Sequence, residues 1–119
     1  MIKQGEIWKV DLEPTKGDEI GKARPVIILN SNSIGKLDLK IVAPVTNWSK
    51  QFRFYPWMFN IQNNASNGLS KESAIDCFQI KSISTIRFIE RLGFVDDEIL
   101  FNIHKVVIKT LNPIYNIEK

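Results

Sequence analysis

Residues 17–31 read Gly17-Asp18-Glu19-Ile20-Gly21-Lys22-Ala23-Arg24-Pro25-Val26-Ile27-Ile28-Leu29-Asn30-Ser31, a polar loop that runs without a break into an apolar segment. Gly17 and Gly21 allow backbone conformations that residues with a Cβ avoid, so the loop can bend or move. Pro25 favours extended geometry at Arg24, because its ring crowds a helical preceding residue. Residues 26–29 have the composition of a buried strand. The sequence therefore predicts an arginine held in fixed geometry at the junction of loop and strand, which suits a charge that meets a ligand.

Further strands are predicted on both sides of this stretch. They cover residues 7–12, 37–46, 58–61 and 73–80, and Pro44 indicates an edge or bulge near the end of the second of these. Residues 84–92 favour a short helix, and residues 93–95 a brief extended piece.

The clearest element is a C-terminal helix. Asp96 is a plausible N-cap, and Asp97 and Glu98 place negative charge in the first turn. Pro113 is expected to end the helix. The expected apolar face consists of Ile99, Leu100, Ile103, Val106, Val107 and Leu111, with Glu98, Asn102, Lys105 and Lys109 opposite. Short strands followed by one amphipathic helix predict a mainly β (α+β) fold, a small curled β-barrel.

Length and composition fit one soluble domain covering residues 1–119. Hydrophobic residues make up 44% and charged residues 24%, and the net charge of +3 suits an anionic partner without proving one. Cys77 is the only cysteine, so no internal disulfide can form. No targeting segment and no apolar run of membrane-spanning length is present, so we expect a cytoplasmic protein.

Few groups are available for catalysis. His104 is the only histidine, so the usual zinc ligand sets cannot be assembled, and no acidic cluster points to a magnesium site. No phosphate-binding glycine motif is present, and we expect no cofactor. A Ser-His-Asp triad would need His104, which sits at the margin of the helix's apolar face and is expected to be structural.

Arg24 remains the strongest candidate. An arginine is always charged and forks onto phosphate oxygens, so it can stabilise charge that develops on a phosphoryl group. Chemistry of this kind without a metal suits RNA rather than DNA, because the ribose 2′-hydroxyl is a built-in nucleophile. Taken alone, one arginine before a proline is more often a surface arginine that makes a salt bridge.

An aromatic and basic segment lies in the middle of the chain. Trp48, Phe52, Phe54, Tyr55, Trp57 and Phe59 are interleaved with Lys50 and Arg53. This composition is typical of a platform on which single-stranded bases stack. It is equally compatible with a strand whose alternate aromatic residues face the core.

Several ordered blocks together resemble the MazF/PemK family of toxin endoribonucleases. The blocks are Gly5-Glu6-Ile7-Trp8-x-Val10-Asp11-Leu12-x-Pro14-Thr15-x-Gly17-x-Glu19-x-Gly21-Lys22-x-Arg24-Pro25-Val26, then Ile41-Val42-Ala43-Pro44-Val45-Thr46, residues 73–80 with Gln79, and the helix that opens Asp96-Asp97-Glu98. The resemblance implies an SH3-like barrel, a homodimer, and metal-independent cleavage of single-stranded RNA at short motifs. The implied products are a 2′,3′-cyclic phosphate and a 5′-hydroxyl, and the implied protein partner is a cognate antitoxin.

Site residues follow from the resemblance by position. Arg24 and Thr46 match the family's catalytic pair. Glu19 and Gln79 match supporting residues near it. Composition, rather than position in the family, marks the candidate RNA contacts, which are Lys16, Lys22, Trp48, Lys50 and Arg53.

One departure concerns the residue before Gln79. Many relatives carry an acidic residue there, whereas this chain has Phe78, with Asp76 two residues earlier. Strand alternation places Asp76 and Phe78 on one face, so Asp76 is expected to substitute in part as a supporting residue.

Two rival functions stay open at this point. One is a non-catalytic toxin on the same barrel, similar to the gyrase poisons, which bind rather than cut. The other is a catalytically silent relative that only binds RNA or antitoxin, a reading favoured by Phe78. The pairing of Arg24 with Thr46 favours the nuclease, because a pure binder needs no such pair.

Overall fold

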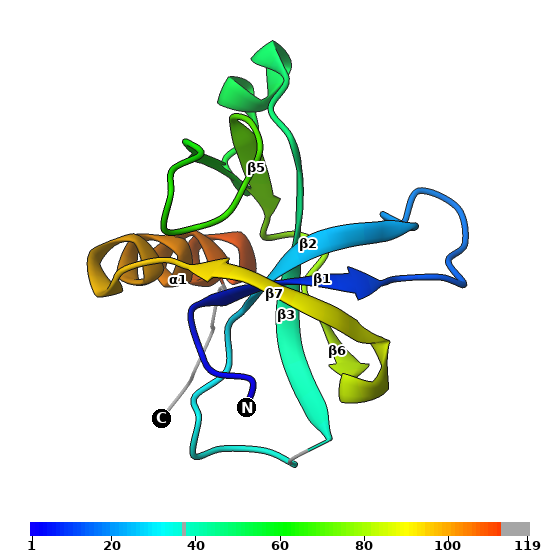
Figure 1. Cartoon of the computed structure of the whole chain (residues 1–119). Helices are drawn as coiled ribbons and strands as arrows, with labels where there is room; N and C mark the ends of the chain where they lie inside the picture. Colours follow the sequence, from blue (N-terminus) through cyan, green and yellow to red (C-terminus); the bar gives the residue numbers. More distant parts are fainter. Residues whose placement is uncertain (37, 113–119) are drawn as a thin grey trace, which may run out of the picture.

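The computed structural model describes residues 1–36 and 38–112 and shows a mainly β fold with one long C-terminal helix (Figure 1). The described elements, in chain order, are β1 (Glu6–Asp11), β2 (Ala23–Ile28), β3 (Leu39–Asn47), the 3-10 helix η1 (Lys50–Phe54), β4 (Met58–Ile61), β5 (Ser73–Asp76), β6 (Lys81–Ser84), the 3-10 helix η2 (Thr85–Arg87), β7 (Phe88–Phe94) and α1 (Asp97–Leu111). The predicted fold class is confirmed.

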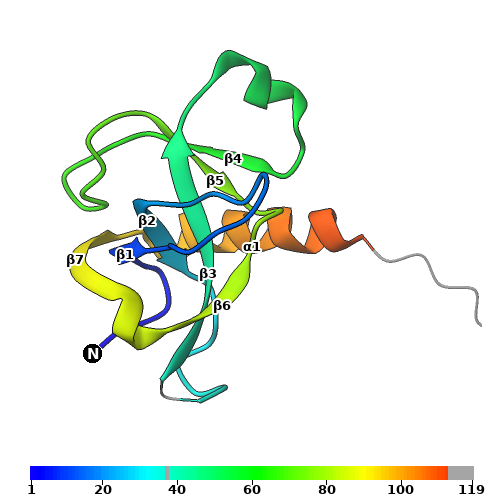
Figure 2. The same ribbon diagram turned by 90° about the vertical axis from the view of Figure 1, so that its right-hand side faces the viewer.

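Strand β3 organises the sheet. It pairs along one edge with β2, and along the other with β6 through residues 39–42 and with β5 through residues 45–47. The strand order is β4-β5-β3-β2-β1-β7, with β6 beside β3, and every described pairing is antiparallel. Figures 1 and 2 show the sheet curled around β3. The path of the described strands ends at β4 and at β7, so the hydrogen-bonded barrel is not closed.

Pro44 lies where the second edge of β3 changes partner. The register leaves Ala43 and Pro44 between the segments paired with β6 and with β5. A residue without an N–H is tolerated at such an interruption. The predicted strand began at Leu37, which lies outside the described residues.

The core has two parts, on opposite faces of the sheet. Along β2, Ile27 belongs to one buried cluster, whereas Val26 and Ile28 belong to the other, because successive side chains of a strand point to opposite faces. Ile103 of α1 is fully buried in the first cluster, so α1 covers that face. The second cluster includes Val10, Val42 and Ile83 and has no helix over it among the residues that the structure describes.

The C-terminal helix begins as predicted. Asp96 is the N-cap, and its Oδ1 accepts a hydrogen bond from the Ile99 N–H at 2.8 Å. Five of the six residues expected on the apolar face are buried or pack against the core. The prediction for the sixth, Leu111, is wrong, because its side chain is 66% exposed in the last turn. The expectation for Pro113 falls outside the described residues. No helix in the described part of the chain is long and apolar enough to cross a membrane.

Two predicted elements need correction. The strand predicted for residues 73–80 ends at Asp76, because the backbone turns there and the Gln79 N–H donates back to the Asp76 carbonyl. The helix predicted for residues 84–92 is limited to Thr85–Arg87, and most of that segment is strand β7, which pairs with β1. Pairing with β1 outweighs the local preference of this stretch, since strand formation depends strongly on neighbours.

The aromatic and basic segment is not a strand before residue 58, where β4 begins. Residues Lys50–Phe54 form η1, drawn at the top of Figure 1, and none of them is buried. Of the aromatic residues in this segment, Phe59 packs against the core, and the reading of alternate aromatics as a core face is wrong for the others. Their rings contact one another instead, in the sequence Trp48, Phe52, Tyr55, Trp57 and Phe78.

Candidate functional site

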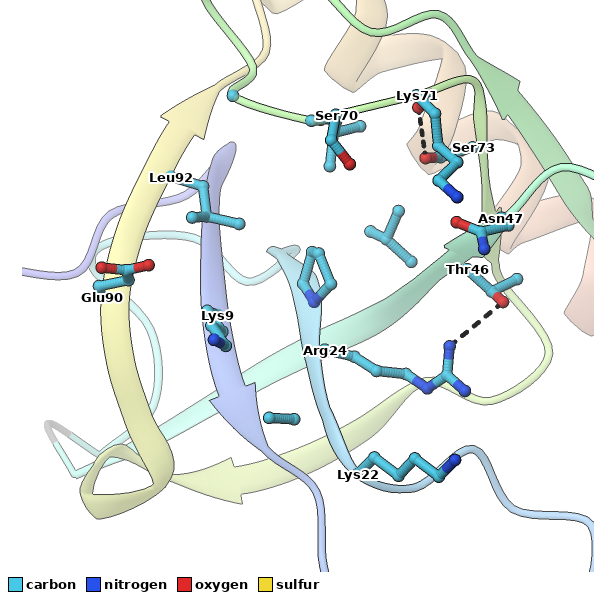
Figure 3. A pocket seen from close by; sticks show the side chains of 15 residues that line it. Lys9, Lys22, Arg24, Thr46, Asn47, Ser70, Lys71, Ser73, Glu90 and Leu92 are labelled. Carbon is cyan, nitrogen blue, oxygen red and sulfur yellow. Dashed lines mark hydrogen bonds between the residues drawn. The ribbon is translucent and has the colours of Figure 1, made fainter.

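Arg24 and Thr46 are brought together by the pairing of β2 with β3. The register matches Val26 with Pro44, Ile27 with Ala43 and Ile28 with Val42. Continuing that antiparallel register by two residues places Arg24 opposite Thr46, because residues two apart share one face of a strand. Figure 3 shows the two side chains pointing toward each other from the neighbouring strands.

Two hydrogen bonds fix the Arg24 guanidinium. Its Nε donates to the Gly21 carbonyl at 2.8 Å, and its Nη1 donates to the Thr46 hydroxyl at 3.3 Å. The side chain is half-buried, so it combines a fixed position with access to solvent. The remaining Nη protons are the donors available to a phosphate. The expected fixed arginine at the junction of loop and strand is present, although it lies inside β2 rather than before it.

The pair opens into a groove with a cavity volume of about 510 Å³ (Figure 3). The groove is lined by four basic side chains and one carboxylate, together with hydroxyls and an amide, and its polar lining consists of Lys9, Lys22, Arg24, Lys71, Glu90, Thr46, Asn47, Ser70 and Ser73. An excess of positive charge in a concave site concentrates anions there. The groove can therefore hold a phosphodiester next to Arg24.

The supporting residues implied by the resemblance lie at different distances from this pair. The Glu19 carboxylate is exposed and accepts a hydrogen bond from the Lys16 N–H at 2.7 Å, so it closes a turn of the β1–β2 loop. Gln79 contacts the same loop, because its Oε1 accepts from the Ile20 N–H at 2.7 Å. Neither side chain is hydrogen-bonded to Arg24 in the described structure.

Asp76 and Phe78 do not share a face, contrary to the expectation. Asp76 is 3% exposed, whereas Phe78 is 66% exposed and packs edge-on against Trp57. The strand has ended between them, so the alternation that the prediction relied on does not apply. Burial raises the pKa of Asp76 above its ordinary value, and hydrogen bonds from Phe78 and Gln79 oppose this rise only in part. Asp76 is a buried acceptor that holds the turn.

The candidate RNA contacts separate into two regions. Lys22 lines the groove, whereas Lys16, Trp48, Lys50 and Arg53 do not. Lys16 is exposed in the β1–β2 loop, and Lys50 and Arg53 are exposed on η1. The Arg53 guanidinium lies 4.7 Å from the centroid of the Phe54 ring, a cation–π contact. In Figure 1, η1 projects from one end of the molecule, away from the centre of the sheet.

Sequence reasoning missed Lys9, Lys71 and Glu90 as groove residues. Lys9 and Glu90 are register partners on β1 and β7, and Lys71 precedes β5, which pairs with the strand end that carries Thr46. No local motif singles these residues out. Only the long-range strand pairings place them beside Arg24.

Cys77 and His104 lie outside the groove. Burial and the nearby Asp76 carboxylate raise the pKa of the Cys77 thiol to about 12, so the thiol is protonated at neutral pH. The Nε2 atom of His104 lies 3.0 Å from the Leu29 carbonyl oxygen, which agrees with the expected structural role. Among residues 1–36 and 38–112, no group of three or more His, Cys, Asp or Glu side chains is placed to hold a metal ion.

Comparison with known proteins shows similarity along almost the whole chain. Endoribonuclease MazF9 of Mycobacterium tuberculosis is 30% identical over 101 residues, which are 80% of this chain and 83% of that protein. The crystal structure of MazF (Form-I) from Deinococcus radiodurans superposes with a TM-score of 0.77 at 19% identity, covering 94% of this chain and 97% of that chain. An endoribonuclease in complex with its cognate antitoxin, from a mycobacterial species, has a TM-score of 0.73 at 14% identity, covering 98% of this chain and 100% of that chain.

Fold and groove define a small protein with a curled antiparallel sheet and a cationic cleft suited to a phosphodiester. The two solved structures share this fold. Residues 3–111 match the family described as PemK-like, MazF-like toxin of type II toxin-antitoxin system, and the chain belongs to that family.

Proposed function

We propose that this toxin is an endoribonuclease that cleaves single-stranded RNA at short sequence motifs without a metal ion, and that residues 1–119 form its single domain. The observation that carries the proposal is the contact between Arg24 Nη1 and Thr46 Oγ1, 3.3 Å apart in a groove with four basic side chains. The name of the M. tuberculosis relative supports the same activity.

The proposed reaction uses the RNA's own 2′-hydroxyl as nucleophile. The 2′-oxygen forms a bond to the adjacent phosphorus while the bond from phosphorus to the 5′-oxygen breaks. A proton leaves the 2′-hydroxyl, and a proton is delivered to the departing 5′-oxygen. The products are a 2′,3′-cyclic phosphate and a 5′-hydroxyl.

Arg24 and Thr46 have separate roles in this reaction. The Nη donors of Arg24 bind the nonbridging phosphate oxygens, where negative charge develops in the transition state. The Thr46 hydroxyl orients the attacking 2′-hydroxyl or donates to a phosphate oxygen. Arg24 is not the general base in this proposal, because a guanidinium is not deprotonated in proteins. Lys22 and the other lysines of the groove bind the flanking phosphates.

Two protein partners complete the proposed function, a second copy of the chain and a cognate antitoxin. Ile86, Ile89 and Phe94 are 91%, 55% and 44% exposed on η2 and on β7, where the strand path ends. An apolar sheet edge of this kind is suited to pairing with another chain. The mycobacterial endoribonuclease solved with its antitoxin supports an antitoxin as the second partner.

Metal independence gives the first test. We expect the purified protein to cut a long single-stranded RNA into discrete fragments in excess EDTA, because Arg24 supplies the positive charge that a metal would otherwise provide. The fragments are resolved on a denaturing gel, and labelling by a 5′-kinase without prior phosphatase treatment detects 5′-hydroxyl ends.

Cleavage lost on chelation and restored by magnesium contradicts the metal-free mechanism. Absence of cleavage under every condition favours the rival reading of a toxin that binds without cutting. Cleavage by the wild type but not by an Arg24→Ala preparation made in parallel excludes a contaminating nuclease.

Dimerisation gives the second test. Sedimentation at micromolar concentration is expected to give about twice the 13.7 kDa chain mass, because a stable interface covers the apolar edge at β7. A particle of single-chain mass that still cuts RNA would show that each chain carries a complete site.

A further inference from the structure

One peptide unit of the β1–β2 loop, residues 12–22, is hydrogen-bonded to Arg24. The carbonyl of Gly21 accepts the hydrogen bond from Arg24 Nε at 2.8 Å. The N–H on the other side of the same peptide belongs to Lys22, and it donates to the Glu13 Oε1 at 2.6 Å. Carbonyl and N–H of one peptide point in opposite directions in one plane. Glu13 therefore fixes the direction in which the Gly21 carbonyl meets Arg24.

Local geometry shows how closely this peptide is held. Lys22 has a φ of +66°, a left-handed conformation that is uncommon for a residue other than glycine. The Lys22 carbonyl also accepts from the Leu12 N–H at 3.0 Å. A Cβ built on Gly21 would lie 2.5 Å from the Glu13 Oε1 and 2.6 Å from the Thr15 Oγ1. The Glu13 carboxylate thus occupies space that only glycine leaves free.

Two side chains hold the loop by hydrogen bonds and are here called clamps. The first is Glu13, which binds the Lys22 N–H, and the second is Gln79, which binds the loop at Ile20, one residue before Gly21. The Gln79 Oε1 accepts from the Ile20 N–H at 2.7 Å, and its Nε2 donates to the Asp76 Oδ2 at 3.1 Å. The other carboxylate oxygen, Asp76 Oδ1, accepts from the Phe78 N–H at 3.0 Å. A carboxylate can only accept here, so it directs the NH₂ group of Gln79 toward itself and leaves the amide oxygen facing Ile20. The buried Asp76 sets the orientation of Gln79, and Gln79 sets the loop.

We propose that Glu13 and Gln79 are positioning residues that orient Arg24 for catalysis through the Gly21–Lys22 peptide. With Nε occupied by the Gly21 carbonyl, the guanidinium presents its Nη1 and Nη2 edge to the phosphate. Losing either clamp frees the peptide, and Arg24 then samples other orientations. The inference deepens the proposed nuclease function and rests on it for its kinetic part.

Two matched pairs of variants test the clamps. Glu13→Ala removes the acceptor for the Lys22 N–H, whereas Glu13→Gln removes the same charge and keeps an oxygen in place. Gln79→Leu removes the three hydrogen bonds of the amide, which join it to the Ile20 N–H, to Asp76 and to the Asp18 carbonyl. Asp76→Asn leaves Gln79 intact but weakens the acceptor that orients it. Glu13 is exposed, so its variants fold even where a change at Gln79 does not.

The first readout does not depend on activity. Amide hydrogen exchange, followed by NMR on the apo protein, is expected to speed up at the Lys22 N–H in Glu13→Ala and at the Ile20 N–H in Gln79→Leu, by about tenfold or more. Glu13→Gln is expected to stay close to wild type. Unchanged exchange at Lys22 in Glu13→Ala overturns the inference, whatever the protein does to RNA.

The second readout is single-turnover cleavage at saturating RNA, with RNA affinity measured separately. Glu13→Ala is expected to lower the cleavage rate constant between about tenfold and a hundredfold, with affinity equal to that of Glu13→Gln, because misplacing a catalytic group costs rate rather than binding. Glu13→Gln is expected to recover most of the rate. Faster exchange with an unchanged rate constant overturns the positioning role while the nuclease function stands, and loss of affinity without loss of rate assigns Glu13 to RNA binding instead.

Discussion

Arg24→Ala is expected to lower the rate of RNA cleavage by about a hundredfold or more, because a donor aimed at developing charge typically contributes about 3 kcal/mol to the transition state. The fold should persist, since the guanidinium makes two hydrogen bonds within the described residues and is half-buried rather than part of the core. Single-turnover cleavage of a short RNA measures the rate, and a thermal melt confirms that the variant is folded.

Arg24→Lys tests the geometry of the charge. A lysine keeps the charge but lacks the planar fork and the Nε donor to the Gly21 carbonyl, so we expect it to recover little of the rate. Lys109→Ala is the control for loss of a surface cation, because that lysine lies in the last turn of α1 and does not line the groove. Near-wild-type cleavage by folded Arg24→Ala would remove Arg24 from the mechanism.

Gly93→Ala is expected to produce a large loss of stability. A Cβ at Gly93 would lie 2.1 Å from the Ser66 carbonyl oxygen and 2.6 Å from the Asn67 carbonyl carbon, both backbone atoms that cannot swing aside. The same Ser66 oxygen accepts from the Phe94 N–H at 3.0 Å. We expect the free energy of unfolding to fall by about 3 kcal/mol, which lowers the melting temperature by roughly 10 to 15 °C.

Gly17→Ala is the matched control for this loss. Gly17 has a φ of +58° but no atom within 4 Å of an added Cβ, so alanine there meets strain and no collision. Its cost is about 1 kcal/mol, the penalty of the left-handed conformation. Equal losses for the two variants, measured in urea, would show that the contact between β7 and residues 66–67 is looser than the structure indicates.

Helix α1 and strands β1 to β4 could be predicted from the sequence, because the signals for these elements are local. Asp96 caps α1 through an N–H three residues away, and the apolar spacing along residues 99–107 matches the face that packs on the core. The strand Met58–Ile61 was predicted with its observed bounds. Such signals depend on neighbours in the sequence, which the unfolded chain already contains.

The errors arose where long-range contacts decide the conformation. The segment after Asp76 has the composition of a strand, but burial of that carboxylate and its bonds to Phe78 and Gln79 turn the chain instead. In the same way, pairing with β1 makes a strand of most of the segment predicted as a helix. Neither of these long-range contacts can be inferred from the local sequence pattern.

The sequence by itself determined the family, the mainly β class and the candidate pair Arg24 and Thr46. The positions of glycine and proline in the loops, the composition of the strands and the order of the motifs can all be read from contiguous residues. Only the tertiary structure decided which charges share the groove with that pair and what orients Arg24. Strand pairings bring Lys9, Lys71 and Glu90 into the groove. Glu13 binds the N–H of the Gly21–Lys22 peptide, and the carbonyl of the same peptide binds Arg24. Such relations exist only after the sheet has curled, since antiparallel register and loop closure bring together residues that the sequence keeps apart.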